Sequence, residues 1–160
     1  MPKSLLIIVV FMVLASCDDN LVKAEFKATD GGIWNKDSIV EFTFTEIDTV
    51  QKHNLFINLR NDQDYPYNNL FLIAELNFPS GDILTDTLEY EMAKPDGQWL
   101  GKGHGSIKEN KLWYKENIVF PSSGVYTLRL AHAMRKNGNV DGVANLEGVT
   151  DVGYEIIKSN

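Results

Sequence analysis

The sequence predicts an all-β fold, an antiparallel β-sandwich of about eight strands with jelly-roll or immunoglobulin-like topology. Three observations support this prediction. In most segments after residue 20, apolar residues recur at every second position, as in strands that bury one face. Short segments rich in glycine, proline, asparagine and aspartate separate these runs. No stretch after residue 20 repeats its apolar residues with the period of an amphipathic helix.

The expected strands follow one another closely along the chain. Residues 24–28 form a weak first candidate, and residues 111–120 form a weak later one. The apolar positions of the stronger candidates are, in chain order, Val40, Phe42 and Phe44; Leu55, Ile57 and Leu59; Leu70, Leu72, Ala74, Leu76 and Phe78; Leu84, Leu88 and Tyr90; Tyr126, Leu128, Leu130 and Met134; and Val152, Tyr154 and Ile156. Because alternate side chains of a strand point to the same face, these residues are expected to form the core.

Turn-forming residues lie between the expected strands. Examples are Asp30-Gly31-Gly32, Pro79-Ser80-Gly81, Pro95-Asp96-Gly97 and Asn137-Gly138. Glycine and asparagine tolerate positive φ, and proline fixes its own φ, so such segments reverse the chain. The pattern locates strands but not their partners, and therefore leaves both sandwich topologies open.

Residues 1–16 are predicted to be a lipoprotein signal peptide. Lys3 precedes an uncharged apolar run from Leu5 to Ala15. At about 1.5 Å per residue, a helix of this length is too short for a hydrocarbon core of about 30 Å. Leu14-Ala15-Ser16-Cys17 matches the bacterial lipoprotein box at all four positions. We therefore expect cleavage before Cys17, lipid attachment to its thiol, a lipidated tether over residues 17–21, and a single sandwich domain over residues 22–160.

The composition limits the partners of the protein. Cys17 is the only cysteine, so no internal disulfide competes for its thiol. The net charge of −7 argues against nucleic acid, whose binding needs clustered lysine and arginine. The same charge argues against adsorption to anionic lipid through a basic patch. Attachment to the membrane is therefore expected to depend on the N-terminal lipid, for example palmitate chains.

The sequence offers three acidic residues as its best candidate for catalysis. Asp86, Glu89 and Glu91 resemble the carboxylate strand of some jelly-roll glycoside hydrolases, but their spacing runs in the reverse order. Strict alternation also places Asp86 on the face opposite the two glutamates. A solvated strand face explains these residues better, and no serine nucleophile motif occurs in the chain. We predict no catalytic residue and no enzymatic activity.

No metal or cofactor site is predicted either. His53, His104 and His132 are widely separated and show no ligand spacing. Residues 137–142 resemble the first half of a calcium loop, but its twelfth position is Gly148 rather than glutamate. An Asn-Gly turn accounts for this segment equally well.

Two kinds of residue suggest a surface for a partner. Tyr65 and Tyr67 flank Pro66 in an expected loop, and Trp99 follows a Pro-Asp-Gly turn. Aromatic side chains at such positions either bind a partner or cap the end of the sandwich core, and both interpretations remain open. Arg135 and Lys136 add a pair of cations to an acidic chain. These five residues form the candidate partner surface.

Several long segments resemble the gliding-motility lipoprotein family GldH. The segments are residues 61–72, residues 86–101, residues 133–138 and residues 145–153, together with the lipoprotein box. The resemblance implies a cell-envelope lipoprotein, anchored on the periplasmic side of the outer membrane and required for gliding over surfaces. The resemblance leaves the molecular task open. Together with the lipoprotein box and the absence of a catalytic set, it favours a non-enzymatic assembly or scaffold component that contacts other envelope proteins of the gliding and type IX secretion machinery. The alternative is a carbohydrate-binding or glycoside-hydrolase-like sandwich domain.

Overall fold

The computed structural model describes residues 20–160, and these residues form an all-β structure. The predicted signal peptide, Cys17 and most of the predicted tether lie outside the described residues. The strands are β1 (Leu21–Ala28), β2 (Ile33–Asn35), β3 (Val40–Phe44), β4 (His53–Asn61), β5 (Asn69–Asn77), β6 (Ile83–Glu91), β7 (Lys108–Ile118), β8 (Tyr126–His132), β9 (Asn145–Glu147) and β10 (Val149–Lys158). Within residues 20–160, no helix is long and apolar enough to span a membrane.

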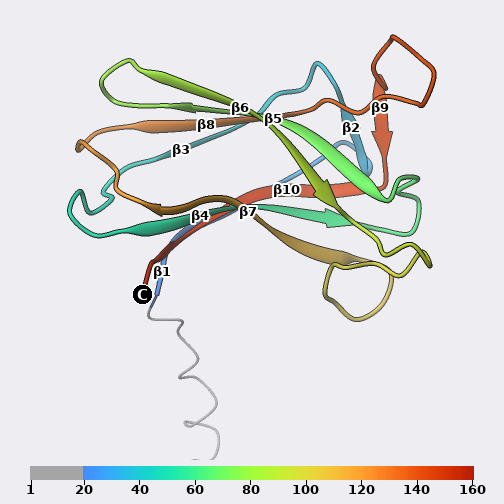
Figure 1. The fold of residues 1–160 in the computed structure, drawn as a ribbon, viewed down its shortest axis with the longest axis horizontal. Helices are drawn as coiled ribbons and strands as arrows, with labels where there is room; N and C mark the ends of the chain where they lie inside the picture. The colour runs from blue at the N-terminus through green and yellow to red at the C-terminus, as the bar shows by residue number, and fades with distance from the viewer. Residues whose placement is uncertain (1–19) are drawn as a thin grey trace, which may run out of the picture.

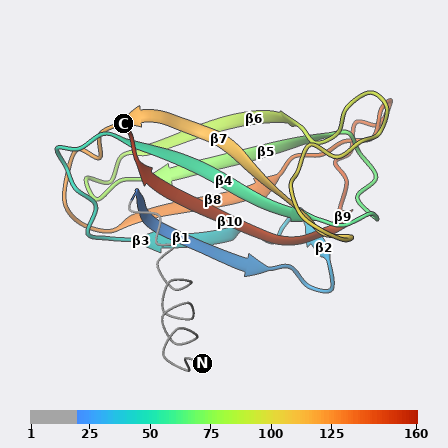
Figure 2. The same ribbon diagram turned by 90° about the horizontal axis from the view of Figure 1, so that it is seen from below.

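Two four-stranded antiparallel sheets pack face to face and confirm the predicted sandwich. One sheet has the order β1-β10-β4-β7, and the other has the order β3-β8-β5-β6. Figure 1 shows the two layers, and Figure 2 shows the first sheet from below, with its strands side by side. The third pair, β2 and β9, forms a short ribbon at one end of the sandwich.

The strand pairs are nested, and this nesting identifies the topology. β1 pairs with β10, β2 with β9, β3 with β8, β4 with β7, and β5 with β6. The chain therefore folds back on itself as one long antiparallel hairpin. Further pairing of β10 with β4 and of β5 with β8 rolls this hairpin into two layers. Among the two topologies that the sequence left open, the structure has the jelly-roll arrangement.

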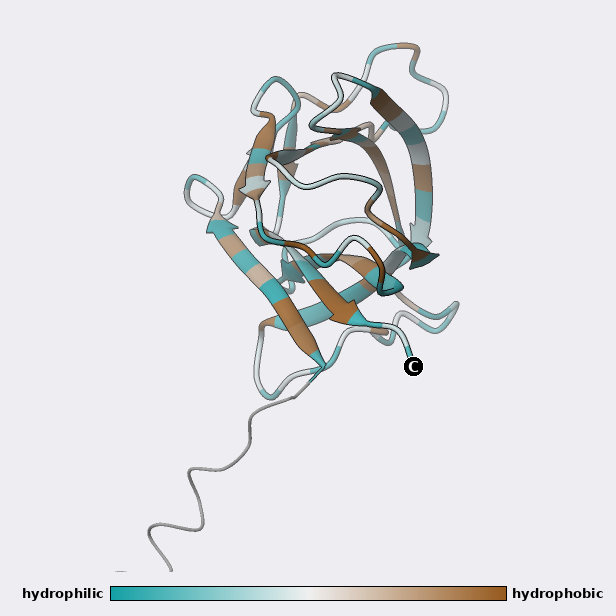
Figure 3. Ribbon diagram, turned by 90° about the vertical axis from the view of Figure 1, so that its left-hand side faces the viewer, coloured by the Kyte–Doolittle hydropathy of each residue, from teal (hydrophilic) through white to brown (hydrophobic). Residues whose placement is uncertain are grey.

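Most of the alternating residues that the sequence predicts form the core, but Leu84 of β6 is exposed, which corrects the prediction at that strand. Leu70, Leu72, Ala74 and Leu76 of β5 are buried, as are Val152, Tyr154 and Ile156 of β10. Hydrophilic and hydrophobic residues alternate along the strands in Figure 3. The buried residues of both sheets form one hydrophobic cluster. Burial of this apolar surface is the main favourable contribution to folding.

The structure corrects the strand prediction in two respects. The weak candidates at 24–28 and 111–120 are the strands β1 and β7, which begin three residues earlier than expected. The periodic pattern does not reveal β2 and β9, because each has only three residues. Such a segment is too short to show a period of two.

The connections between strands lie at two opposite ends of the sandwich. The distal end comprises residues 29–32, 36–39, 62–68, 92–107 and 133–144, together with the β2–β9 ribbon. The proximal end comprises the start of β1, the end of β10, and residues 45–52, 78–82 and 119–125. β1 begins at the proximal end, so Asn20, the first described residue, lies there as well.

Truncation of a core leucine is expected to show which face of β5 is buried. Leu72 is fully buried, whereas its neighbour Ile73 is exposed on the opposite face. Leu72→Ala should lower the free energy of unfolding by about 2–5 kcal/mol, because it removes buried apolar atoms and leaves a cavity. Ile73→Ala should cost less than about 1 kcal/mol. Urea denaturation of both variants measures the difference, and equal losses would contradict the assigned faces.

Candidate functional site

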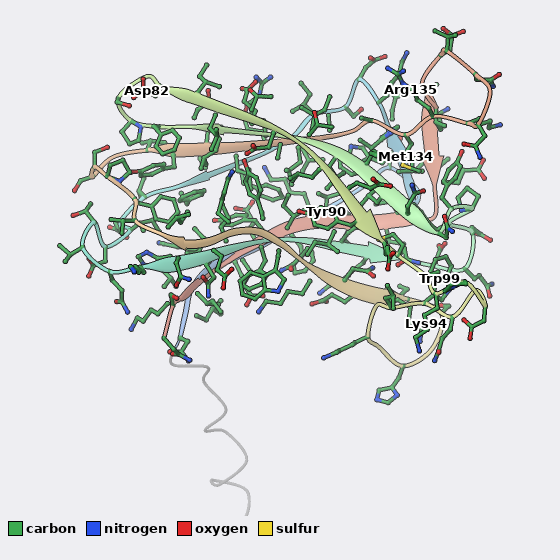
Figure 4. The ribbon with its side chains drawn as sticks, in the orientation of Figure 1. Asp82, Tyr90, Lys94, Trp99, Met134 and Arg135 are labelled. Carbon is green, nitrogen blue, oxygen red and sulfur yellow. The ribbon has the colours of Figure 1, made fainter. Side chains whose placement is uncertain are left out.

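The candidate surface is assembled at the distal end from loops that are far apart in the sequence. Residues 62–68 connect β4 to β5, residues 92–107 connect β6 to β7, and residues 133–144 connect β8 to β9. Figure 4 shows Trp99 and Arg135 at this end, whereas Asp82 lies at the proximal end. The nested pairing of the strands brings these loops together.

Tyr65 is part of the core and not of the surface. Its exposed fraction is only 3%. Its hydroxyl donates a hydrogen bond of 2.7 Å to the backbone oxygen of Asn69, which satisfies the buried polar atom. Burial raises the pKa of the Tyr65 hydroxyl far above its usual value. The expectation that Tyr65 offers contact area to a partner is therefore corrected, since this ring caps the distal end of the core.

Tyr67 and Trp99 are half-buried beside this cap. The ring of Tyr65 makes edge contacts with both, at centroid distances of 6.0 Å to Tyr67 and 6.1 Å to Trp99. Trp99 is held by a backbone bridge to Ala93 and by the neighbouring hydrogen bond from Leu100 N to Met92 O. Both rings therefore cover the end of the core, as one of the two interpretations expected. One side of each packs on the core, and part of each side chain remains accessible.

Arg135 and Lys136 are exposed where the chain leaves β8. A backbone bridge between Arg135 and Gly142 closes the base of the 133–144 loop. Neither cation forms an ion pair with any residue from 20 to 160. Their charges are therefore available to an acidic group of a partner.

A cavity of about 710 Å³ lies between the 133–144 loop and the β4–β5 loop. Its lining combines Tyr67 and Pro66 with polar side chains and with Gly142, Val143 and Ala144. The polar lining includes Lys136, Asn137, Asn139, Asp141, Asn145 and Glu147. Tyr67 and Lys136, from the predicted surface, thus share one site, whereas Tyr65, Trp99 and Arg135 do not line it.

Sequence reasoning missed the contribution of β9 to this cavity. Asn145 and Glu147 lie on either side of the buried Leu146 and reach the site only because β9 pairs with β2. Asn145 also accepts a hydrogen bond of 2.7 Å from the side chain of Asn35 on β2. The alternation of polar and apolar residues at 145–147 was the only available signal, and three residues are too few to interpret.

The three carboxylates considered for catalysis do not converge. Asp86 lies on the inner side of β6, 2.8 Å from Lys115 Nζ, and accepts a hydrogen bond of 3.0 Å from Tyr114. The Lys115 ammonium is the main reason why the pKa of Asp86 is lowered. Glu89 and Glu91 point outward and line a separate hollow with Asn68 and Asn69. This arrangement agrees with the solvated strand face and lacks the close carboxylate pair of retaining glycosidases.

The three histidines lie apart from one another. His53 and His132 are buried, and His104 is exposed. Nε2 of His132 lies 2.9 Å from the Trp34 carbonyl oxygen, which can only accept a hydrogen bond. Within residues 20–160, no three histidine, cysteine or acidic side chains are grouped closely enough to hold a metal ion.

The buried histidines should make the fold sensitive to mild acid. Burial lowers the pKa of both His53 and His132 below the usual 6.5. The unfolded chain therefore binds more protons than the folded one below about pH 6.5, and stability is lost as the pH falls from there. The loss should reach at most about 1.4 kcal/mol per pH unit for each histidine. Urea denaturation between pH 7.5 and pH 5.5 measures this slope.

A variant of one buried histidine isolates its contribution. His132→Gln removes a buried imidazole and should reduce the pH dependence in this range. The lowered pKa values of Asp48, Glu75 and Asp86 act only near and below pH 4, so they do not contribute to this window. A slope that is unchanged in His132→Gln would contradict the assignment.

Comparison with known proteins places the chain in a family. Residues 21–156 match the family described as GldH lipoprotein. The chain is 52% identical over 149 residues to a gliding motility lipoprotein GldH homolog of Christiangramia forsetii, covering 93% of this chain and 91% of that protein. It is 48% identical over 145 residues to the gliding motility lipoprotein GldH of Flavobacterium johnsoniae, covering 91% of this chain and 89% of that protein.

A solved structure shows only weak similarity. The VP2 subviral particle of infectious bursal disease virus aligns with a TM-score of 0.37 and 13% identity, over 87% of this chain and 30% of that chain. Similarity at this level supports no conclusion about function. The relatives and the match to residues 21–156 are decisive instead, and the chain belongs to the GldH lipoprotein family.

Proposed function

We propose that this gliding-motility lipoprotein is a non-enzymatic scaffold of the gliding and type IX secretion machinery, which holds other envelope proteins at its distal end. The family supports a membrane-anchored lipoprotein of the cell envelope. The single observation that carries the scaffold role is the position of the candidate surface. Tyr67, Trp99, Arg135 and Lys136 all lie at the end opposite the start of β1.

The anchor is proposed at Cys17. Residues 1–16 would be removed as a signal peptide, and residues 17–21 would connect the lipid to the sandwich domain of residues 22–160. Two or more acyl chains hold a protein stably at a membrane, whereas a single chain binds only marginally. We place the lipid in the outer membrane, on its periplasmic side. This position would leave the distal end free to meet partners.

The proposed partner surface combines a rigid aromatic edge with uncompensated charge. Tyr67 and Trp99 are already packed against Tyr65, so little side-chain entropy remains to be lost on binding. Arg135 and Lys136 supply positive charge on a chain of net charge −7. Aromatic and arginine side chains of this kind contribute most of the binding energy in many interfaces. We infer a protein partner with an acidic patch.

Removal of the two cations is expected to weaken partner capture. Arg135→Ala with Lys136→Ala should reduce recovery of envelope partners from detergent-solubilised membranes, because charge-assisted contacts to the partner are lost. An anchor residue contributes about 2 kcal/mol or more, which corresponds to roughly a 30-fold weaker affinity. Pull-down of the acylated protein followed by mass spectrometry measures the recovery.

The control changes charge at a different place. Glu89→Gln with Glu91→Gln alters the outer face of β6 and should leave both partner capture and gliding intact. Melting temperatures of all variants should be similar, since the four side chains are exposed. Unchanged capture by a folded Arg135→Ala, Lys136→Ala protein would refute the proposed surface. Loss of gliding in the glutamate variant would instead favour a role in carbohydrate chemistry.

Carbohydrate binding is the second candidate function, and the 710 Å³ cavity favours it. Amide and carboxylate groups such as Asn139 and Glu147 pair with sugar hydroxyls, and the ring of Tyr67 offers a face for a pyranose. Titration calorimetry with soluble cell-wall and capsule oligosaccharides tests this function. Binding that is lost in Tyr67→Ala but kept in Arg135→Ala would support it, and absence of heat with every glycan would reject it.

A further inference from the structure

Exposed aliphatic side chains mark the proximal end of the sandwich. Val50 lies in the β3–β4 connection with an exposed fraction of 86%. Val119 and Val125 are the first and last residues of the β7–β8 connection and are also exposed. Figure 3 looks onto this end of the molecule. We call Val50, Val119 and Val125 the valine rim.

Local contacts hold the valine rim in position. The side chain of Asp48 accepts hydrogen bonds from Val50 N at 2.8 Å and from Gln51 N at 3.0 Å, which stabilises the turn that carries Val50. In the other connection, Phe120 and Tyr126 are buried next to the exposed valines. The Tyr126 hydroxyl donates a hydrogen bond of 2.7 Å to Ser122 O, which closes that loop. These hydrogen bonds and the buried neighbours therefore fix the two connections in the conformation that exposes the valines.

The two connections belong to one continuous surface with the chain ends. Ser159 N donates a hydrogen bond of 2.9 Å to Lys52 O in the β3–β4 connection. Ser159 Oγ also donates to Asn117 Oδ1, beside the last residue of β7. Lys158 N donates a hydrogen bond of 2.8 Å to Asn20 O, so the described chain is tied to β10 from its first residue. The valine rim and Asn20 thus lie on the same end of the molecule.

The covalent distance to the lipid is short. From Cys17 to Asn20 there are three residue steps, which span at most about 11 Å even when fully extended. The headgroup layer of a bilayer is itself about 5–8 Å thick on each side. The closeness of the sandwich to the bilayer rests on the proposed acylation of Cys17. Given that acylation, the proximal end cannot move far from the membrane surface.

We propose that the valine rim contacts the lipid bilayer that carries the Cys17 anchor, and that it enters the headgroup region. Residues 119–125 contain no charged side chain, so the approach of this connection to the bilayer incurs no cost of removing water from an ion. The charged Asp48 and Lys52 beside Val50 limit that residue to the headgroup level. Transfer of the exposed valines out of water is favourable. The bilayer would then orient the sandwich with its long axis away from the membrane, and the distal surface would face outward.

Site-specific fluorescence tests this orientation. Val50→Cys, Val119→Cys and Val125→Cys are each made in the full chain and labelled with a nitrobenzoxadiazole probe, because acylation blocks Cys17, the only native cysteine. The acylated proteins are reconstituted into phosphatidylethanolamine and phosphatidylglycerol vesicles with brominated acyl chains. Val140→Cys is the matched control, since Val140 lies at the distal end with an exposed fraction of 88%.

The expected result is a blue-shifted emission and bromine quenching at all three rim positions, with neither effect at Val140. Flotation confirms that each protein is bound to vesicles, and circular dichroism confirms that it is folded. An unquenched probe at Val50 in a floating, folded protein overturns the inference and leaves the lipid anchor intact. Equal quenching at Val50 and Val140 also overturns it. If the anchor proposal itself is wrong, mass spectrometry finds two probes per chain and no acyl groups, and the inference fails with it.

Discussion

Replacement of Cys17 by serine is expected to remove the protein from its membrane anchor entirely. A serine hydroxyl cannot form the thioether that carries the diacylglyceryl group, and Cys17 is the only cysteine in the chain. Without that modification, the signal peptide of residues 1–16 should remain uncleaved. Intact-mass measurement and labelling with an alkyne fatty acid should show a heavier, unlabelled precursor, and gliding should be lost with it.

A neighbouring small residue provides the control for this experiment. Ser16→Ala keeps a small side chain in the lipoprotein box and should be processed and acylated normally. The decisive measurement is the location of any Cys17→Ser protein whose signal peptide has been cleaved. Cys17→Ser protein that has lost its signal peptide and still fractionates with membranes would show that the anchor does not depend on this thiol.

A methyl group at Gly148 is expected to cause the largest loss of stability of any single substitution considered. Gly148 precedes β10 and has a φ of +77°, which L-residues with a side chain rarely adopt. A Cβ atom built at this position would lie 2.1 Å from the backbone nitrogen of Tyr65. The neighbouring hydrogen bond from Asp62 N to Gly148 O, at 2.9 Å, ties the same two segments together. The substitution would therefore displace the Tyr65 cap from the core.

The matched control separates backbone strain from this steric conflict. Gly138 has a similar φ of +84°, but a Cβ atom there would meet nothing within 4 Å. Gly138→Ala should cost about 1–2 kcal/mol for the positive φ alone. Gly148→Ala should cost about 4 kcal/mol or more, because a contact with backbone atoms cannot be relieved by a rotamer change.

Thermal unfolding measures both variants. Since 1 kcal/mol corresponds to about 2–4 °C in a domain of this size, Gly148→Ala should melt at least about 5 °C below Gly138→Ala. Equal melting temperatures would mean that the β4–β5 loop does not depend on close contact with Gly148. In that case the positions of Tyr65 and of the adjoining cavity would need another explanation.

Strands that bury one face could be predicted from the sequence, because the alternation of apolar and polar residues is a local pattern. In β5, Leu70, Leu72, Ala74 and Leu76 alternate with less buried residues, and a period of two is visible without knowledge of any partner strand. The opposite orientation of Asp86 relative to Glu89 and Glu91 followed from the same alternation, and the structure agrees. The strands β2 and β9 could not be predicted in this way, because three residues carry too little pattern.

The candidate surface was only partly predictable for a related reason. Tyr65 and Tyr67 stand two residues apart, and nothing in their spacing distinguishes a core cap from an accessible ring. The backbone of Tyr65 lies directly against Gly148, which is more than 80 residues away in the chain, and no local pattern reveals this contact. The cavity likewise depends on β9, whose place is set by its pairing with β2.

The sequence by itself determined the β-rich fold class, the buried faces of strands such as β5 and β10, the lipoprotein box and the family resemblance, because each depends on neighbouring residues. Tertiary structure alone decided the jelly-roll order, in which β1 pairs with β10 and β5 with β6. It also decided that Tyr65 is buried and that the loops of the candidate surface meet at one end. These features depend on pairing between distant segments, and a periodic pattern shows that a strand has a buried face without showing which strand lies beside it.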